Sequence, residues 1–281
     1  GKLYYNTLLF SLLPFIVLYG LRQFSEGIGI TKYALYITLF ANAVNIILNW
    51  ALIYGHLGFS PMGVKGAALA TLISRVIMLI AFLALFIKLE PYNRYLKHFS
   101  RKFINKEILS DVLKTSVPLS FQNLVEITAF SLSAIMVGWS GKVSLAAHQV
   151  AMSMSSFSFM LTLGVGAAST IRVSHQYGFG DYVAMRKAGF AAVHLSVALM
   201  SVSGIAYILL RNYIPIIYTE DILVRELAAK LLIIAALFQI FDAMQLSGLA
   251  ALRALADVKI PLILSIISYY FVCLPLGSFC G

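Results

Sequence analysis

The sequence is poor in charge, since only 11% of its 281 residues are Asp, Glu, Lys or Arg while 60% are hydrophobic. A soluble domain averages about 25% charged residues because it must wet its surface. Acidic residues are the scarcer sign, with 11 Asp and Glu against 21 Lys and Arg. The composition therefore excludes an ordinary soluble domain. The net charge of +10 does not require a nucleic-acid partner, because the basic cytoplasmic loops of a membrane protein explain it.

Cysteines and catalytic motifs are also scarce. Cys273 and Cys280 lie close together near the C-terminal end and form neither a disulfide framework nor a metal-ligand spacing. The chain has no Gly-rich phosphate loop, no GxSxG elbow and no paired-His zinc motif. An intramembrane aspartyl protease would need a second deep Asp beside Asp242, and the other Asp residues fall in predicted loops or at helix ends. We therefore expect no enzyme, no resident cofactor and no metal site.

Long apolar runs are what the sequence does have. Many reach about 20 residues, which matches the thickness of the hydrocarbon layer of a bilayer. They predict an all-α membrane protein, a polytopic helical bundle that crosses the membrane eight times. The expected spans are about Leu3 to Phe24, Tyr33 to Tyr54, Val64 to Ile87, Ile108 to Trp139, Val143 to His175, Tyr182 to Leu210, Ile222 to Arg253 and Ile260 to Phe279.

Lys and Arg residues concentrate in alternate loops between these spans, which predicts the cytoplasmic face. The longest loop, from Lys88 to Lys114, is basic and contains Pro91. It predicts a boundary between two bundles. We expect three membrane helices in residues 1–90, a basic cytoplasmic linker on the inner leaflet in residues 91–110, and five membrane helices in residues 111–281. Specific binding of an anionic lipid is the alternative role of the linker.

Two carboxylates fall deep inside apolar spans, Glu126 in the fourth and Asp242 in the seventh. A charge near the middle of the bilayer costs at least a few kcal/mol unless it faces a cavity or a partner. A buried salt bridge is the simplest explanation, but few basic partners are at hand. Arg75 is expected near the outer third of its span and Arg253 at an inner helix end. Desolvation and mutual repulsion disfavour ionisation of such a pair, so it can take up a proton or a small cation.

Polar side chains in other spans suggest further contacts. Asn45 and Asn49 are four residues apart, so they share one helix face and can offer carbonyl oxygens to a cation or a polar substrate. Interhelical hydrogen bonding is the alternative for both. Gln149 opens the fifth span and either lies at the membrane interface or lines a vestibule.

Several stretches together resemble the multidrug and toxic compound extrusion (MATE) transporters, and they follow one another in the order found in that family. They are LRQFSEGIGITK (21–32), NIILNWALIYGHLGFSPMGVKGAALAT (45–71), SVPLSFQNLVEITAF (116–130), SGKVSLAAHQVAMSM (140–154), GVGAASTIRVSHQYGFGD (164–181) and LFQIFDAMQLSGLAALRALADVKIP (237–261). The resemblance implies twelve helices in two lobes around a central cavity. The eight spans here resemble the fourth to the eleventh helices, so the first three and the last are expected outside this sequence.

The resemblance also implies roles for single residues. Glu126 and Asp242 are similar to the paired carboxylates of the C-terminal lobe, which bind the coupling cation or proton. Asn45 and Asn49 are similar to the polar pair of the N-terminal lobe's cation site, which also needs an acid from the first helix of the family. A second set is expected to contact substrate in the cavity: Thr71, Gln149, Phe238 and Gln239. Phe238 stands where some relatives have tyrosine, and the lost oxygen favours a proton over sodium.

The resulting hypothesis is a secondary active transporter that exports cationic or amphipathic drugs by antiport with Na⁺ or H⁺. Its expected partners are these small molecules and membrane lipid, with no nucleic acid. We expect a monomer that crosses a bacterial inner membrane several times. A lipid or polysaccharide flippase of the same superfamily is the first alternative and predicts a strongly cationic cavity. A fragment that does not transport is the second.

Overall fold

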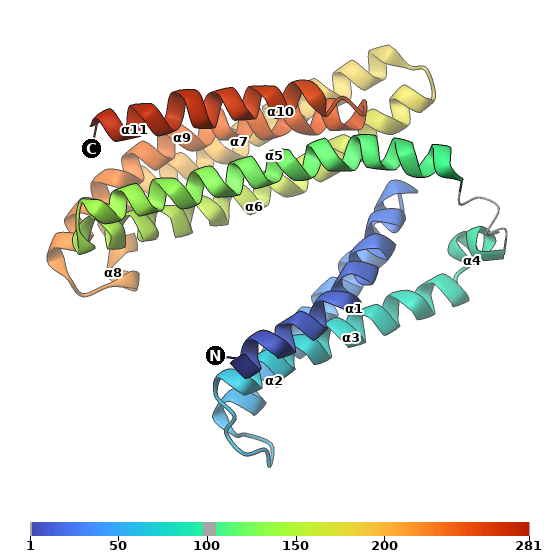
Figure 1. The fold of residues 1–281 in the computed structure, drawn as a ribbon, viewed down its shortest axis with the longest axis horizontal. Coiled ribbons are helices and arrows are strands. Elements are labelled where there is room, and N and C mark those ends of the chain that lie inside the picture. Colours follow the sequence, from blue (N-terminus) through green and yellow to red (C-terminus); the bar gives the residue numbers. More distant parts are fainter. Residues whose placement is uncertain (1, 98–104, 281) are drawn as a thin grey trace. The chain divides into compact units, whose positions relative to one another are not determined.

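Helices are the regular secondary structure of this computed structural model, and no strand occurs in residues 2–97 or 105–280. The structure describes those two ranges, and it describes side chains in residues 9–97 and 105–277. The chain divides into two units, residues 1–104 and 105–281 (Figure 1). Each unit is described by itself.

Helix α3 (Val64–Lys88) is the centre of the first unit, because both α1 (Lys2–Gly27) and α2 (Lys32–Tyr54) pack along it. Figure 1 shows α1 lying beside α3. The α2–α3 contact is close at Gly66, where an added Cβ atom would lie 2.5 Å from the carbonyl oxygen of Leu52. Small residues allow membrane helices to approach in this way.

A short helix, α4 (Glu90–Lys97), also belongs to the first unit. Its Tyr92 is fully buried, and the hydroxyl groups of Tyr92 and Ser25 are hydrogen-bonded at 2.6 Å. The predicted linker of residues 91–110 therefore begins inside a packed helix and reaches into α5 (Lys106–Trp139). Residues 98–104, which include the basic Arg101 and Lys102, lie outside the described part. The cytoplasmic role of the linker stays a prediction.

The second unit has a core of three long helices, α6 (Lys142–Gly178), α7 (Tyr182–Leu210) and α9 (Ile222–Ala254), which pack against one another. Helix α8 (Ile214–Tyr218) joins α7 to α9. Asp181 and Asp221 lie at helix starts, where each carboxylate accepts a hydrogen bond from the backbone of the first turn, at 2.8 Å from Ala184 and at 2.9 Å from Leu223. Such caps satisfy amide groups that have no partner within the helix.

Helix α5 makes its broadest contacts with the C-terminal segment of the second unit and fewer with α6. Figure 1 shows this segment lying beside α5. The predicted last span is not one regular helix. It consists of α10 (Lys259–Ile266), a π-helical turn η2 (Ile267–Cys273) and α11 (Leu274–Cys280). The second unit therefore has two packing groups, α6–α7–α9 and α5–α10–η2–α11.

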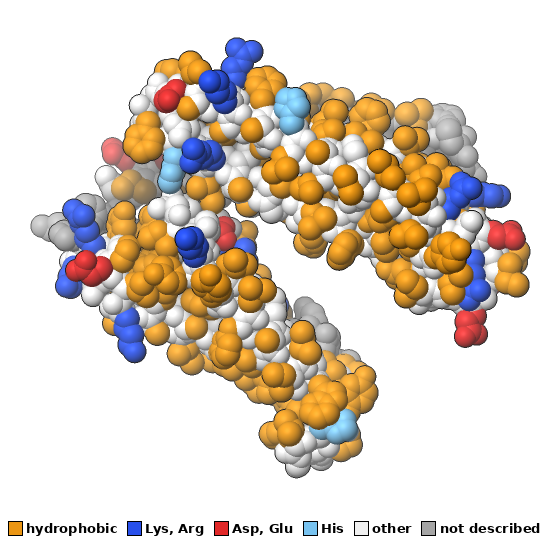
Figure 2. Space-filling model, turned by 180° about the vertical axis from the view of Figure 1, so that it is seen from behind, with side chains coloured by type: hydrophobic (Ala, Val, Ile, Leu, Met, Phe, Trp, Pro, Cys, Tyr) orange, Lys and Arg blue, Asp and Glu red, His pale blue; other side chains and the backbone are white. Residues whose placement is uncertain are grey.

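Seven helical segments of the described chain are long and apolar enough to cross a membrane, against eight predicted spans. The sixth predicted span, Tyr182–Leu210, coincides with α7, and the others agree to within three residues at the start and at the end. Helix α1 covers the remaining span, Leu3 to Phe24, but is not among the seven, and the side chains at its start are not described. On the face in Figure 2, hydrophobic side chains cover the helix flanks while charged side chains gather towards helix ends, as a bilayer requires. The all-α polytopic fold is confirmed.

Candidate functional site: an acidic cavity in the second unit

Three helices of the second unit, α5, α6 and α9, line an open cavity of about 530 Å³. This size lies within the range of ligand pockets, roughly 300–1,000 Å³. The cavity wall is mainly apolar with hydroxyl and amide groups. It is formed by Asn123, Glu126, Ile127, Phe130, Ser131, Met152, Ser155, Ser156, Phe159, Leu163, Phe238, Asp242, Leu246 and Arg253.

The two deep carboxylates predicted from the sequence line this same cavity. Glu126 projects from α5, and its neighbours in the wall follow the three- and four-residue spacing of a single helix face. Asp242 projects from α9, where Phe238 and Leu246 lie one turn before it and one turn after it. The acids thus come from the two different packing groups of the second unit. A change in their charge therefore changes the electrostatic interaction between those two groups.

Neither carboxylate is held by a fixed basic side chain. The ion pairs within 4.0 Å among the described residues are Arg22–Glu26 in the first unit and Lys114–Asp111 on the exposed part of α5. Asp242 forms no hydrogen bond or ion pair with another described residue. Glu126 accepts a hydrogen bond of 3.5 Å from the Tyr269 hydroxyl. Half-buried acids of this kind favour binding of a proton or a cation.

Tyr269 lies in the π-helical turn and was not predicted as a site residue. Its hydroxyl donates to Glu126 and accepts a hydrogen bond of 3.3 Å from Nε2 of Gln245 on α9. One hydroxyl therefore connects a carboxylate on α5 to a side chain on α9. Short π-helical segments are frequent at functional sites. Their signal in the sequence is too weak for Tyr269 to have been found.

Arg253 is the third charged residue of the cavity wall. The sequence placed it at an inner helix end, and it is the last residue but one of α9, yet it also lines the cavity. Its Nη2 donates to Oε1 of Gln122 at 3.3 Å, and Nε2 of Gln122 donates to Oγ of Ser265 at 3.2 Å. This chain of hydrogen bonds connects α9, α5 and α10. The Arg253 guanidinium is thus hydrogen-bonded to the neutral amide of Gln122 and to neither Glu126 nor Asp242.

Of the three residues of the second unit that were predicted to contact substrate, one lines the cavity and two do not. Phe238 lines the cavity. Gln239 is fully buried, and its Nε2 donates to the carbonyl oxygen of Met200 on α7 at 3.2 Å, so it ties α9 to α7 instead of facing the cavity. Gly204 makes room for this amide, because a Cβ atom there would lie 3.0 Å from the Gln239 nitrogen. Gln149 is exposed on α6 and is not part of the cavity wall.

The predicted polar residues of the first unit form a network of their own. Nδ2 of Asn49 donates to Oδ1 of Asn45 at 2.9 Å, and Nδ2 of Asn45 donates to Oγ of Ser74 at 3.2 Å. Asn45 therefore makes an interhelical hydrogen bond, the alternative from the sequence, while the bond of Asn49 stays within α2. Asn45 and Thr71 also line a cavity of about 250 Å³ between α1, α2 and α3. Arg75 lines it too, near the middle of α3 rather than near the outer third of the span as the sequence suggested.

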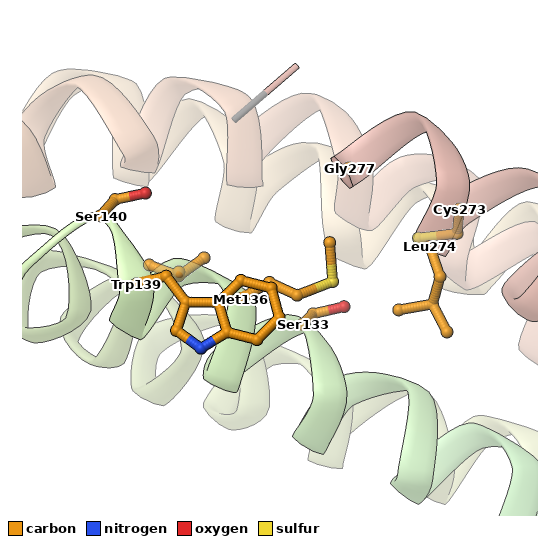
Figure 3. Close-up of a pocket in the computed structure, with 8 residues that line it drawn as sticks. Ser133, Met136, Trp139, Ser140, Cys273, Leu274 and Gly277 are labelled. Carbon is orange, nitrogen blue, oxygen red and sulfur yellow. The ribbon is translucent and has the colours of Figure 1, made fainter. Parts of the chain in front are cut away.

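A further cavity of about 370 Å³ lies between the end of α5 and the C-terminal segment. Figure 3 shows Met136 and Trp139 of α5 on one side, with Cys273 and Leu274 on the other. Its polar side-chain groups are two hydroxyls, one thiol and the indole N–H of Trp139, with no charged side chain. Within the described residues, no cluster of three His, Cys, Asp or Glu side chains suits a metal ion. The acidic cavity therefore remains the candidate site.

Known proteins match this chain in sequence and in fold. The family model MatE matches residues 118–279, which contain the acidic cavity. The multidrug resistance protein NorM of Burkholderia vietnamiensis is 36% identical over 98% of this chain and 60% of its own length. A probable multidrug resistance protein NorM of Brucella suis is 34% identical over 97% of this chain and 59% of its own. The chain spans about 60% of the length of these curated relatives.

Two solved structures show the same fold. An outward-facing multidrug resistance MATE family transporter of the MOP superfamily matches with a TM-score of 0.85 at 22% identity, covering 96% of this chain and 59% of that one. A MOP superfamily transporter from Pyrococcus furiosus, whose binding pocket is described as reversed in polarity, gives 0.86 at 20% identity, covering 98% and 61%. The candidate spans and the relatives agree with the predicted location, a multi-pass protein of a bacterial inner membrane. The chain belongs to the MatE family.

Proposed function

We propose that this chain forms part of a secondary active transporter that exports cationic or amphipathic drugs by antiport with protons or sodium ions. The observation that carries the proposal is the presence of Glu126 and Asp242 in one cavity of ligand size, neither of them in an ion pair with a described residue. The family and its NorM members support a transporter rather than an enzyme.

The chemistry follows from charge balance. With both acids ionised, the cavity attracts a cationic substrate, and the aromatic rings of Phe130, Phe159 and Phe238 provide apolar contact area. When protons or a sodium ion neutralise the acids, that attraction is lost. Drug and coupling ion therefore compete for the same charge, which is what antiport requires.

The two packing groups provide a physical route from ion binding to movement. Ionised acids on α5 and α9 repel each other across the cavity, and a bound ion removes this repulsion. Ion binding changes which side of a cavity is open only if the ion binds more tightly to one conformation. We propose that the α5–α10–η2–α11 group shifts against the α6–α7–α9 group as the ion binds, and that this shift contributes to alternating access of the two lobes. Such sites between helix groups fit the general scheme of secondary transporters.

The choice of coupling ion follows from the oxygen groups at hand. Phe238 offers no oxygen one turn before Asp242, whereas the Tyr269 hydroxyl lies 3.5 Å from Glu126. Two carboxyl groups and one hydroxyl suffice for a proton, and sodium would need further oxygen ligands from the cavity wall or from water. We therefore propose the proton as the primary coupling ion. The pair Asn45 and Asn49 remains a proposed but weaker ion site, because the carbonyl oxygen of Asn45 already accepts from Asn49.

The test uses the full-length transporter in proteoliposomes with an imposed pH or sodium gradient and ethidium as the cationic probe. Wild-type protein is expected to move ethidium against its gradient, and Glu126→Gln and Asp242→Asn to abolish gradient-driven movement. Glu107→Gln and Asp111→Asn are matched controls, because both acids lie exposed near the start of α5. Unchanged transport in both cavity variants would refute the assignment, and a wild type that fails to respond to either gradient would refute antiport.

The flippase alternative is less well supported by the second unit. A lipid pyrophosphate carries several negative charges and would meet two carboxylates against one guanidinium in this cavity. The same proteoliposomes distinguish the alternatives, since a flippase would move a fluorescent anionic lipid between leaflets and leave ethidium in place. A fragment that does not transport would do neither.

A further inference from the structure

The cavity of the first unit differs in charge from the acidic cavity. Three helices line it, and its charged side chains are Arg75 of α3 and Arg22 of α1. Arg22 is already paired, since its Nε lies 2.7 Å from Oε1 of Glu26. The remaining charge of this cavity is therefore the guanidinium of Arg75.

Arg75 is held in a defined orientation. Its Nη1 donates to Oγ of Ser11 at 2.5 Å, and its guanidinium carbon lies 4.7 Å from the ring centroid of Phe15. Both contacts come from α1, so they fix an α3 side chain against a neighbouring helix. A guanidinium has five N–H donors in a planar fork that matches a carboxylate. The Ser11 contact uses one of them.

The depth of Arg75 distinguishes it from a basic residue that reaches the headgroup layer. It lies near the middle of α3, roughly 17 Å along the helix from its start and roughly 20 Å from its end. Basic residues this deep in a span normally face a cavity and pair with a negative group. No carboxylate of a described residue lies within 4.0 Å of Arg75.

The rest of the cavity wall suits an anion with an apolar body. Asn45 lines the same cavity, and its hydrogen bonds to Ser74 and from Asn49 leave its amide a second N–H donor. Phe15 and Tyr19 supply aromatic surface on the α1 side. The volume of about 250 Å³ suits a small ring rather than a lipid.

We propose that the cavity between α1, α2 and α3 binds the carboxylate of a small organic anion through Arg75, with the ring of the anion against Phe15. One guanidinium that lacks an acidic partner matches one carboxylate, and it does not match the several charges of a pyrophosphate. This site is separate from the acidic cavity and does not depend on the proposed antiport. A carboxylate is the ligand that fits beside Arg75.

The test measures equilibrium binding of benzoate to the full-length transporter in nanodiscs of zwitterionic lipid, without any ion gradient. Benzamide has the same ring and no charge, so it isolates the contribution of the carboxylate. Wild-type protein is expected to bind benzoate and not benzamide. Arg75→Gln should weaken benzoate binding about tenfold or more. Arg75→Lys, which keeps the charge but not the fork, should give an intermediate loss.

Arg186→Gln is the matched control, because Arg186 also lies over an aromatic ring, 5.6 Å from the Phe190 centroid, but near the exposed start of α7. It should leave benzoate binding unchanged. If wild-type protein does not bind benzoate, or if Arg75→Gln binds it as tightly as wild type, the proposal is wrong. If Arg75→Gln fails to fold, Arg75→Lys, which keeps the charge, provides the second measurement.

A carboxylate from another part of the full-length protein could instead occupy Arg75. In that case wild-type protein would not bind benzoate, which also overturns the proposal. A lipid headgroup is the other anion that could bind at Arg75, and adding anionic lipid to the nanodiscs tests it. Competition of this lipid with benzoate would assign the site to a headgroup and overturn the proposal of a small-molecule ligand. Glu126→Gln should lose ethidium transport and keep benzoate binding, so the two proposals can fail separately.

Discussion

The two units of this chain are built by the same means and differ in the charge of their cavities. Each packs apolar helices closely through small residues, as at Gly66 in the first unit and at Gly204 in the second. Two arginines line the cavity of the first unit, and one of them, Arg22, is paired with Glu26, whereas two carboxylates and one arginine line the cavity of the second. Helix packing in a membrane therefore leaves the choice of ligand charge to a few inward side chains.

Replacing a negative charge of the acidic cavity by a positive one should have the largest effect on transport. Asp242→Lys places a cation where we propose that drug and ion bind, so ethidium transport should fall roughly a hundredfold or more through electrostatic repulsion. The measurement is the initial rate of gradient-driven transport in proteoliposomes. Asp111→Lys carries the same charge change on the exposed part of α5 and should transport normally. Transport by Asp242→Lys at the wild-type rate would refute the proposal that drug and ion bind in the acidic cavity.

The helix contacts offer a second comparison. Gly66→Ala forces a Cβ atom to 2.5 Å from a backbone oxygen of α2, and backbone cannot move aside as a flexible side chain can. We expect a loss of about 2 kcal/mol in the free energy of unfolding, as for other overpacked sites. Gly166→Ala should cost far less, because its Cβ atom would lie 3.6 Å from that of Ala250, an ordinary contact. Thermal unfolding in detergent measures both, and equal losses would contradict the description of the α2–α3 contact.

Arg253 is the side chain that makes the cavity of the second unit resemble that of the first. Arg253→Gln removes its charge, so the affinity for ethidium should rise roughly threefold by Coulomb's law at intermediate separation. Fluorescence titration without a gradient measures the affinity, and Arg186→Gln is the control outside the cavity. An unchanged or weaker affinity would show that Arg253 acts only through its hydrogen bond to Gln122.

Tyr269→Phe should have the smallest effect. It removes the hydroxyl that connects Glu126 to Gln245 and keeps the ring, whose centroid lies 6.0 Å from that of Phe130. The hydroxyl donates to the ionised Glu126 carboxylate and stabilises that form, so its loss should raise the affinity of Glu126 for the coupling proton by a few-fold. The half-maximal ion concentration for transport measures this. Tyr270→Phe, one residue along the same π-helical turn, should leave it unaltered.

Much of the fold could be predicted because span length and composition are properties of the chain alone. The apolar run from Tyr182 to Leu210 coincides with α7, and Glu126 and Asp242 line one cavity as expected for two deep acids. Hydropathy determines where a span begins and ends. It places each of these two acids well inside its own span.

What could not be predicted is the direction in which each side chain points around its helix. Gln239 and Asp242 are three residues apart and were both expected at the cavity, yet Gln239 contacts Met200 on α7 while Asp242 lines the cavity. Adjacent parts of one helix face contact different neighbours, and only the packed arrangement decides which. The same applies to Arg253, whose place at a helix end concealed its place in the cavity wall.

The central claim is that a mobile positive ion, displaced by drug, neutralises Glu126 and Asp242. The most direct measurement adds ethidium to purified full-length transporter in weakly buffered detergent and records released protons, with bound ²²Na⁺ followed in parallel. Wild-type protein is expected to release protons in proportion to bound ethidium, and the double variant Glu126→Gln/Asp242→Asn is expected to release none. Release of either ion by the double variant at the wild-type level, or ethidium binding by wild type with no ion displaced, would contradict it.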